Sequence, residues 1–183
     1  MAKTTEQQFD SAIAECVDIF TKKMKDYGTA WRILRPSSLT DQIYIKAQRI
    51  RSIEEKGQQK IEDSIRGEYV GIINYCAMAL IQCSIGYEST PIAHDKIQAM
   101  FEEKLVESKN LMLNKNHDYG EAWRQMRISS YTDLILMKIH RTKQIEDNKG
   151  NTIISEGVEA NYMDMINYAI FALIRIEESS NNQ

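Results

Sequence analysis

The strongest constraint on this chain is a repeated heptapeptide, DYGTAWR at Asp26–Arg32 and DYGEAWR at Asp118–Arg124, whose copies begin 92 residues apart. The similarity extends beyond the motif, because a gap-free comparison of Asp26–Glu54 with Asp118–Glu146 finds 16 identical residues in 29 positions. After one inserted residue, Tyr69, Asn74, Tyr75, Ala79, Leu80 and Ile81 match Tyr162, Asn167, Tyr168, Ala172, Leu173 and Ile174. The chain therefore carries one structural unit twice.

Each unit is predicted to form three helices. Apolar residues recur at helical spacing, and the 183 residues include only two prolines and eight glycines, a composition that favours helix. We expect helices over about residues 5–27, 38–56, 63–85, 92–119, 130–147 and 155–178. The prediction is an all-α fold of two tandem three-helix repeats, residues 1–86 and 91–179, joined by the linker 87–90. The repeats should pack as one compact body about a pseudo-twofold axis, because each alone would expose an apolar face.

Helix boundaries are predicted from capping residues. Four helices should begin at pairs of capping or first-turn residues: Thr5 with Gln8, Ser38 with Asp41, Thr90 with Pro91, and Ser130 with Asp133. Four helices should end at glycines: Gly28, Gly57, Gly86 and Gly120. Residues 58–60 should form a polar turn, and residues 179–183 a loose polar tail.

Composition narrows the classes of function. The net charge is -3, whereas a broad nucleic-acid-binding surface is usually strongly basic, so only a local cationic pocket is expected. The N-terminus lacks an apolar signal core, and the longest apolar run, Cys76–Ile81, is too short for a membrane span. Cys16, Cys76 and Cys83 are interpreted as small core residues in a reducing cytoplasm, and the histidines lack metal-ligand spacing. We expect a monomer with internal pseudo-symmetry or a homodimer.

Two cations lie within or beside the apolar stripe of the second helix of each unit. On a helical wheel Lys46 and Arg49 fall among isoleucines, and the second unit repeats this arrangement. A buried cation is costly unless it is paired. One reading is a structural ion pair, with Asp26 or Glu54 in the first unit and Asp118 or Glu146 in the second, and the other is a phosphate clamp. The candidate phosphate-binding residues are Lys46, Arg49, Arg32, Lys138, Arg141 and Arg124.

Acidic residues give a candidate metal site. Asp26 and Asp118 each lie in the last turn of a helix, where the helix dipole disfavours an acid, so a metal ion or a cation should compensate. The units differ at one position, where the second unit has Asp164 and the first has Gly71. If only one unit binds a metal, the second is therefore the better candidate. Mg²⁺ suits such oxygen ligands and would pair with substrate phosphates. The candidate catalytic residues are Asp118, Asp164 and Glu146, and the candidate metal ligands are Asp118, Asp164 and Asp26.

Aromatic and amide side chains give a candidate base or sugar pocket. The tryptophan of each heptapeptide could stack on a base, although a tryptophan after a glycine cap is more often a core plug. The asparagine in each long apolar helix needs partners, which either a ligand or a neighbouring helix could supply. The candidate base-binding or sugar-binding residues are Tyr27, Trp31, Asn74, Tyr119, Trp123 and Asn167.

These segments resemble a known family. DYGTAWR, the following LTDQIYIKAQRIRSIE, and the apolar helix containing Asn74 and Tyr75 resemble the nucleotide modification associated domain 1 family. The resemblance covers nearly the whole chain, with the motif block present twice. It implies a bacterial or phage protein linked to nucleotide or base modification, and it implies no particular reaction.

A more distant similarity is to the all-α MazG-like nucleoside triphosphate pyrophosphohydrolases, which hold Mg²⁺ against a triphosphate with acidic helices. Their pattern, E-E-x-x-E followed by E-x-x-D, is not met, since Glu159 and Asp164 are five residues apart. The leading interpretation is a cytoplasmic protein that binds a small-molecule nucleotide, with Mg²⁺-dependent (deoxy)nucleotide phosphohydrolysis as its extension. The alternative is a non-enzymatic helical scaffold or interaction domain, in which the repeated polar residues form a buried network.

Overall fold

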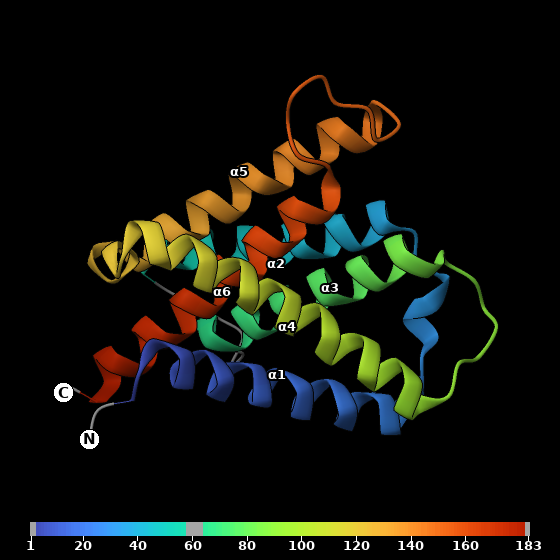
Figure 1. Cartoon of the computed structure of the whole chain (residues 1–183), viewed down its shortest axis with the longest axis horizontal. Coiled ribbons are helices and arrows are strands. Elements are labelled where there is room, and N and C mark those ends of the chain that lie inside the picture. Colours follow the sequence, from blue (N-terminus) through green and yellow to red (C-terminus); the bar gives the residue numbers. More distant parts are fainter. Residues whose placement is uncertain (1–2, 58–63, 182–183) are drawn as a thin grey trace.

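A computed structural model of the protein describes residues 3–57 and 64–181 (Figure 1). This part of the chain folds into six α-helices and two short 3₁₀-helices, and it contains no strand. In chain order the elements are α1 (Thr5–Tyr27), η1 (Ala30–Ile33), α2 (Pro36–Lys56), α3 (Ile65–Ile85), α4 (His94–Tyr119), η2 (Ala122–Gln125), α5 (Ile128–Asp147) and α6 (Val158–Asn181). The all-α prediction is confirmed.

Helix ends agree with the sequence better than helix starts. Four helices end at the predicted glycines: Gly28, Gly57, Gly86 and Gly120. The capping box of α1 lies one residue earlier than predicted, because Thr4 is the N-cap and pairs with Gln7 instead of Thr5 with Gln8. α4 begins at His94 with Ala93 as its N-cap, so the predicted start at Thr90 and Pro91 is wrong.

The starts predicted for α2 and α5 are also wrong. Pro36 is the first residue of α2, where its fixed φ and missing N–H suit the first turn, and α5 begins at the equivalent Ile128. Ser38 and Ser130 therefore lie inside helices instead of capping them. α6 likewise begins three residues later than predicted and continues into the predicted tail. The turn predicted at residues 58–60 and the helix start predicted at residue 63 lie outside the described residues.

The two aspartates predicted to cap these helices form ion pairs between α2 and α5 instead. Asp41 Oδ1 lies 2.9 Å from Lys143 Nζ, and Asp133 Oδ1 lies 3.8 Å from Arg51 Nη1. The pairs are equivalent under exchange of the two halves of the chain. Because these side chains are largely exposed, the pairs contribute little to stability, but they mark the same contact from both sides.

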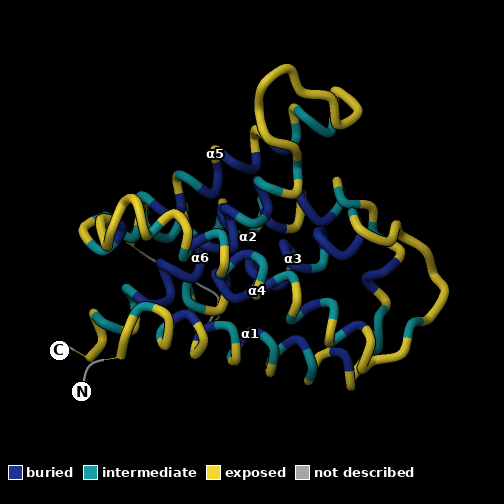
Figure 2. The backbone as a smooth tube through the Cα atoms, viewed as in Figure 1, coloured by how far each residue is buried: buried dark blue, intermediate teal, exposed yellow. Residues whose placement is uncertain are grey.

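α3 and α6 form the centre of the structure and pack against each other (Figures 1 and 2). α2 packs on α3 and α5 on α6, α2 also contacts α5, and α1 and α4 pack against each other and against both central helices. Exchanging the two halves leaves these contacts unchanged, the pattern expected of two repeats about a pseudo-twofold axis. Cys16 and Cys76 are buried as free thiols, as predicted, and Cys83 is partly buried.

A buried polar network joins the two halves. Thr40 Oγ1 of α2 lies 2.8 Å from Glu146 Oε1 and 2.6 Å from the hydroxyl of Tyr162. The same network recurs with the halves exchanged, in the equivalent residues Thr132, Glu54 and Tyr69. Burial raises the pKa of both glutamates. Each half therefore supplies the threonine of one network and the glutamate and tyrosine of the other.

α3 is the one described helix that is long and apolar enough to cross a membrane. Its most apolar stretch is 67% buried inside the protein. The central helix of a water-soluble protein has the same length and composition, so these two properties do not assign α3 to a bilayer.

Candidate functional site

The heptapeptide forms a turn that returns a tryptophan to the core. α1 ends at Tyr27, and Gly28 then adopts φ 66° and ψ −141°, a conformation that is essentially restricted to glycine. η1 follows and carries Trp31 inward, where it is buried. The second copy repeats the turn with Gly120 at φ 61° and ψ −147°, and Trp123 is buried likewise. Both tryptophans are core residues, and each also lines a cavity.

A cavity of about 450 Å³, which we call the first cavity, lies between α1, η1, α2 and α3. Six side chains of interest line it: Lys23, Tyr27, Trp31, Lys46, Asn74 and Tyr75. Lys46 Nζ lies 5.8 Å from the centroid of the Tyr75 ring. Burial raises the pKa of Tyr27, and the nearby Tyr75 and Asp26 raise it further. This phenol therefore stays protonated at neutral pH and can donate a hydrogen bond.

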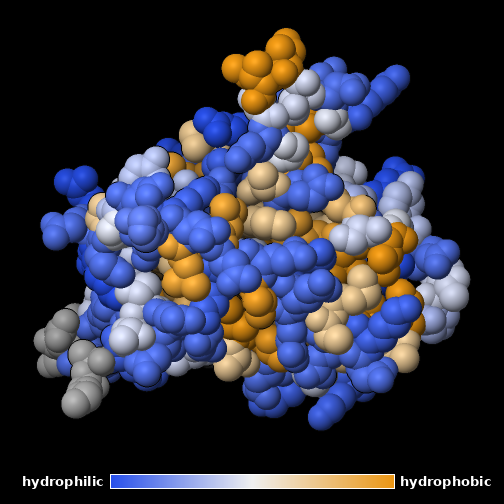
Figure 3. Space-filling model, in the orientation of Figure 1, coloured by the Kyte–Doolittle hydropathy of each residue, from blue (hydrophilic) through white to orange (hydrophobic). Residues whose placement is uncertain are grey.

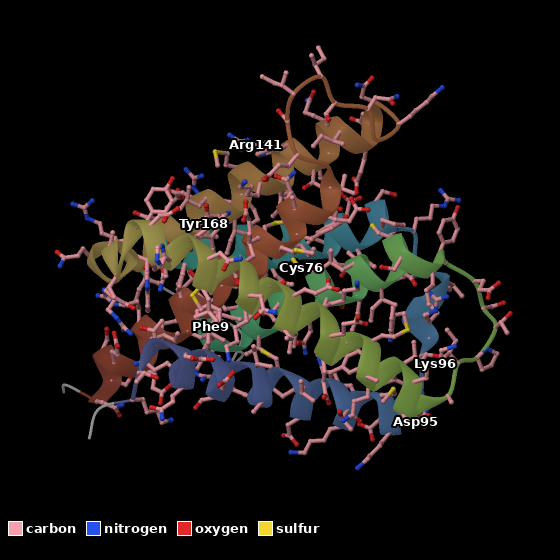
Figure 4. All side chains as sticks on the ribbon, viewed as in Figure 1. Phe9, Cys76, Asp95, Lys96, Arg141 and Tyr168 are labelled. Carbon is pink, nitrogen blue, oxygen red and sulfur yellow. The ribbon has the colours of Figure 1, made fainter. Side chains whose placement is uncertain are left out.

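An equivalent cavity of about 390 Å³, the second cavity, lies between α4, η2 and α6. Its lining contains the matching residues from the other half together with an acid: Lys115, Tyr119, Trp123, Asp164, Asn167 and Tyr168. Tyr168, which is labelled in Figure 4, lines this cavity from α6. Burial also raises the pKa of this phenol. The sequence repeat is thus a repeat of cavities, and all six predicted base-binding or sugar-binding residues line them, three in each cavity at equivalent positions.

Two of the side chains that line each cavity carry a buried polar atom without a hydrogen-bond partner in the described structure: Trp31 Nε1 and Asn74 Oδ1 for the first cavity, Trp123 Nε1 and Asn167 Oδ1 for the second. These four side chains are only 5% to 8% exposed. The amide nitrogens are already engaged, since Asn74 Nδ2 donates to the Cys16 carbonyl at 3.3 Å and Asn167 Nδ2 to the Ser108 carbonyl at 2.9 Å. An unpaired buried donor or acceptor costs about 1–3 kcal/mol, so a ligand that pairs with these atoms would gain from them.

The cations of α2 are paired, but not with the predicted acids. Lys46 Nζ lies 3.3 Å from Glu68 Oε2, and Arg49 Nη1 lies 2.8 Å from Glu68 Oε1. The prediction of Asp26 or Glu54 as partner is wrong, because Glu68 on α3 faces α2 across their contact. Arg49 does not line the first cavity, so Lys46 is the cation of this pair that faces it.

The second half places its acid elsewhere. Asp164 accepts from Lys115 Nζ at 2.8 Å and from Lys138 Nζ at 2.7 Å. In the first half Gly71 stands at the equivalent position, and Lys46 passes over it so closely that a Cβ there would lie 2.7 Å from Lys46 Cε. The two cavities therefore have the same framework but a different distribution of charge.

Two predicted phosphate ligands are held by neighbouring helices and line neither cavity. Arg32 donates to the side chain of Gln82 and, at 2.6 Å, to the carbonyl of Gly86 at the end of α3. Arg124 donates to Glu178 of α6 at 2.5 Å, and its guanidinium lies 4.3 Å from the Trp123 ring centroid. Both arginines anchor the short 3₁₀-helices to the rest of the protein.

Lys138 and Arg141 line a third, open hollow of about 1060 Å³, beside the segment 148–157. Arg141 is labelled on α5 in Figure 4. This segment projects from the body of the protein, and its two isoleucines, Ile153 and Ile154, are 100% and 95% exposed. Figure 3 shows a hydrophobic cluster at the top of the molecule, where this segment projects in Figure 1. Arg141 is exposed here and does not line the second cavity.

The predicted metal ligands and catalytic acids do not converge. Asp26 is exposed, and Asp118 is exposed with His117 Nδ1 at 3.0 Å, while Glu146 belongs to the network with Thr40. Both carboxylate oxygens of Asp164 already accept from lysines. No group of three histidine, cysteine, aspartate or glutamate side chains able to hold a metal occurs in the described part of the chain. These donors do not fit Mg²⁺, which requires several oxygen ligands around one point.

Some residues of the cavities escaped the sequence prediction. Lys23 and Lys115 were missed, although extending the gap-free comparison three residues upstream of Asp26 and Asp118 would have matched them. Tyr75 and Tyr168 were visible as identities but were not assigned to a pocket. No local pattern could have identified Glu68 as the partner of Lys46, because the contact depends on how α3 packs against α2.

Comparison with known proteins agrees with the internal repeat. The model of the family described as nucleotide modification associated domain 1 matches the chain twice, over residues 23–83 and 115–176. No curated protein and no solved structure matches the chain. The two matched segments include the heptapeptide turns and most of both central helices. The chain therefore belongs to the nucleotide modification associated domain 1 family, whose domain it carries in tandem.

Proposed function

We propose that the protein binds a nucleotide in the first cavity. The observation that carries the proposal is that two side chains of its lining, Trp31 and Asn74, each have a buried polar atom without a partner in the described structure, Nε1 and Oδ1. An indole N–H can only donate and a carboxamide oxygen can only accept, so the pair complements the donor and acceptor groups on the edge of a nucleobase. A family named for nucleotide modification supports the same class of ligand.

The charges around the first cavity suit the phosphate of such a ligand. Lys23 lines the cavity and forms no ion pair within the described residues. Lys46 makes the longer of the two contacts to Glu68, and its ammonium group has three donors, so it can also donate to a phosphate. The remaining charged pair in the lining, Arg66 with Glu15, is bidentate and neutral as a unit.

The size and walls of the first cavity are also appropriate. Pockets that bind small ligands usually measure about 300–1,000 Å³, and this cavity measures about 450 Å³. Tyr27 and Tyr75 supply aromatic surface, and stacking of a base on an aromatic side chain contributes about 1–3 kcal/mol. The base would lie among the tyrosines and Trp31, with the phosphate toward the lysines.

The proposal concerns binding and assigns no hydrolytic step. A Mg²⁺-dependent phosphohydrolase would need carboxylates that meet around the metal, and Asp118, Asp164 and Glu146 contact three different sets of residues. The charge of a bound phosphate would instead be met by lysine.

A helical scaffold is the second candidate function. The observation that favours it is that Arg32, Arg124 and Glu146 join helices to one another. Such contacts explain why both copies contain these residues without reference to any ligand. They do not explain the unpartnered atoms in the cavities, and for this reason we place nucleotide binding first.

Isothermal titration of the purified protein with nucleoside 5′-monophosphates of each base, without added metal, tests the proposal. We expect binding with one base preferred, and at least a tenfold loss of affinity in Lys23→Glu, because that change reverses the charge of an exposed cavity cation. Lys25→Glu is the matched control, since Lys25 is exposed on the same helix but outside the cavity lining. No binding by any monophosphate, or equal losses in both variants, would overturn the proposal and favour the scaffold.

A further inference from the structure

We propose that the second cavity is a separate binding site for an uncharged planar heterocycle, namely a nucleobase or a nucleoside without a phosphate. The choice of a base-like ligand rests on the proposed function of the first cavity. The distinction between the two ligands rests on the contrast in charge between the cavities.

The second cavity is built for a ligand. Trp123 Nε1 and Asn167 Oδ1 are buried without partners within the described structure, and both side chains line the space. The Asn167 amide cannot turn over freely, because its nitrogen donates to the Ser108 carbonyl at 2.9 Å. A ligand here must therefore offer an acceptor to the indole and a donor to the amide oxygen.

The lysines of the second half that correspond to those facing the first cavity are both bound to one carboxylate. Lys115 and Lys138 correspond to Lys23 and Lys46, and both donate to Asp164, at 2.8 Å and 2.7 Å. Asp164 itself lines the second cavity. A phosphate entering this space would meet this carboxylate, and a like charge at close range opposes binding.

The position of the acid is what differs between the halves. Gly71 leaves space that the Lys46 side chain occupies, with Nζ 3.0 Å from where a Cβ would lie. The second cavity presents the carboxylate of Asp164 at the equivalent position. The same point of the framework therefore carries a positive charge in one cavity and a negative charge in the other, which selects an anion in the first and N–H donors in the second.

The two cavities also differ in size and in the position of one phenylalanine. Phe171 lines the second cavity where Met78 lines the first, whereas Phe20 lines the first where Met112 lines the second. The Phe171 ring stacks on Trp123 with centroids 4.3 Å apart and planes inclined by 16°. The second cavity is the smaller, at about 390 Å³ against about 450 Å³, and a smaller space suits a base or nucleoside better than a nucleotide.

Titration calorimetry with matched nucleosides and nucleoside 5′-monophosphates separates the two sites. Tyr27 and Tyr119 lie at the exposed edge of the two cavities and can be replaced without opening the core. We expect Tyr119→Ala to weaken nucleoside binding about tenfold, through the loss of stacking, and to leave monophosphate binding unchanged. Tyr27→Ala should do the reverse.

Asp164 gives a second, independent arm of the test. We expect Asp164→Asn, which removes the charge, to raise the stoichiometry of monophosphate binding from one to two per chain. Asp164→Glu retains the charge and should leave the stoichiometry at one. Thermal unfolding of each variant in the absence of ligand shows whether it is folded. If Asp164→Asn does not fold, the Tyr119→Ala experiment alone tests the second site.

The outcomes distinguish the two proposals. Nucleoside binding that is lost in Tyr27→Ala and kept in Tyr119→Ala, or that is not detected while monophosphates bind, would overturn the second site alone. Nucleoside binding sensitive only to Tyr119→Ala, without any monophosphate binding, would overturn the proposed function of the first cavity and support the second site.

Discussion

Lys138 and Lys115 share one buried carboxylate, that of Asp164, and this sharing determines the cost of removing either lysine. Lys138→Met removes a charge, keeps most of the side-chain volume and leaves Asp164 with one partner. Breaking a buried ion pair from one side costs about 3–5 kcal/mol, and the remaining lysine reduces this. We expect the free energy of unfolding to fall by about 2 kcal/mol, measured by urea denaturation.

Lys46→Met is the matched control for this prediction. Glu68 would keep its shorter contact, 2.8 Å to Arg49, and would lose only the 3.3 Å contact to Lys46. We expect a loss of less than about 1 kcal/mol, the range of partly exposed pairs. Equal losses in the two variants would contradict the view that Asp164 depends on Lys138.

Gly71 is a position where stability and binding should move in opposite directions. Gly71 lies inside α3, where alanine favours the helix by about 1 kcal/mol. The new Cβ would displace the flexible end of Lys46, which lies 2.7 Å away at Cε. We therefore expect Gly71→Ala to raise the thermal midpoint slightly and to weaken monophosphate binding about tenfold, or about 1.4 kcal/mol. Unchanged affinity in calorimetry would show that Lys46 does not contact the ligand.

At the level of single residues, the sequence predicted which side chains matter better than it predicted their partners. Lys46 was expected to need an acid because it falls among isoleucines on the helix, and it has one. Glu68 and not Glu54 is that acid, because the partner is chosen by the packing of α2 on α3 and not by position along one helix. Asn74 was expected to be buried with partners, and its nitrogen is satisfied by a neighbouring helix while its oxygen is not.

The contact between α2 and α5 should make stability depend on pH. Burial raises the pKa of Glu146, so the folded protein holds this proton more tightly than the unfolded chain does. Stability from this group is present below the ordinary glutamate pKa of about 4.3 and is lost as pH rises through the raised pKa. Glu146→Gln cannot ionise and escapes this loss. We expect the wild type to lose stability relative to Glu146→Gln between pH 4 and pH 7.

Urea denaturation at several pH values measures this difference. Glu103→Gln is a suitable control, because Glu103 is an exposed glutamate on a different helix, α4. A difference between wild type and Glu146→Gln that stays constant with pH would contradict the effect of burial. A difference of the same size in Glu103→Gln would assign it to net charge instead.

Among the elements, helix ends were predictable because one residue type, glycine, ends four of them. Gly57 shows the reason: it adopts the left-handed conformation, with φ 62° and ψ 16°, that stops α2. Starts were harder, because serine and aspartate also serve inside helices. Asp41 and Asp133 look like caps in the sequence and instead bridge α2 and α5.

In the whole molecule, the two halves hold each other through contacts that do not involve the chain between them. α3 packs on α6, α1 on α4 and α2 on α5, whereas residues 86–91 are exposed. We expect a protease site inserted near residue 88 to be cut without separating the halves. The nicked protein should elute from a sizing column as one species of about 21.2 kDa and retain its helical circular dichroism.

Two separate fragments on the column, or the loss of helical signal after cleavage, would contradict this prediction. The sequence repeat made two similar units predictable, and the apolar face of each made their association predictable. It could not predict that each unit would complete the other's threonine–glutamate–tyrosine network, because that pairing appears only when the helices of both halves are placed together.

The displaced acid of the two halves also restricts how such a chain can diverge after duplication. Glu68 and Gly71 in α3 stand where Asn161 and Asp164 stand in α6, so the carboxylate has moved by one helical turn while the lysine opposite has stayed. Exchanging α3 and α6 between the halves would place each lysine opposite a helix whose carboxylate lies one turn away from where it is needed. α2 with α3, and α5 with α6, are therefore matched pairs.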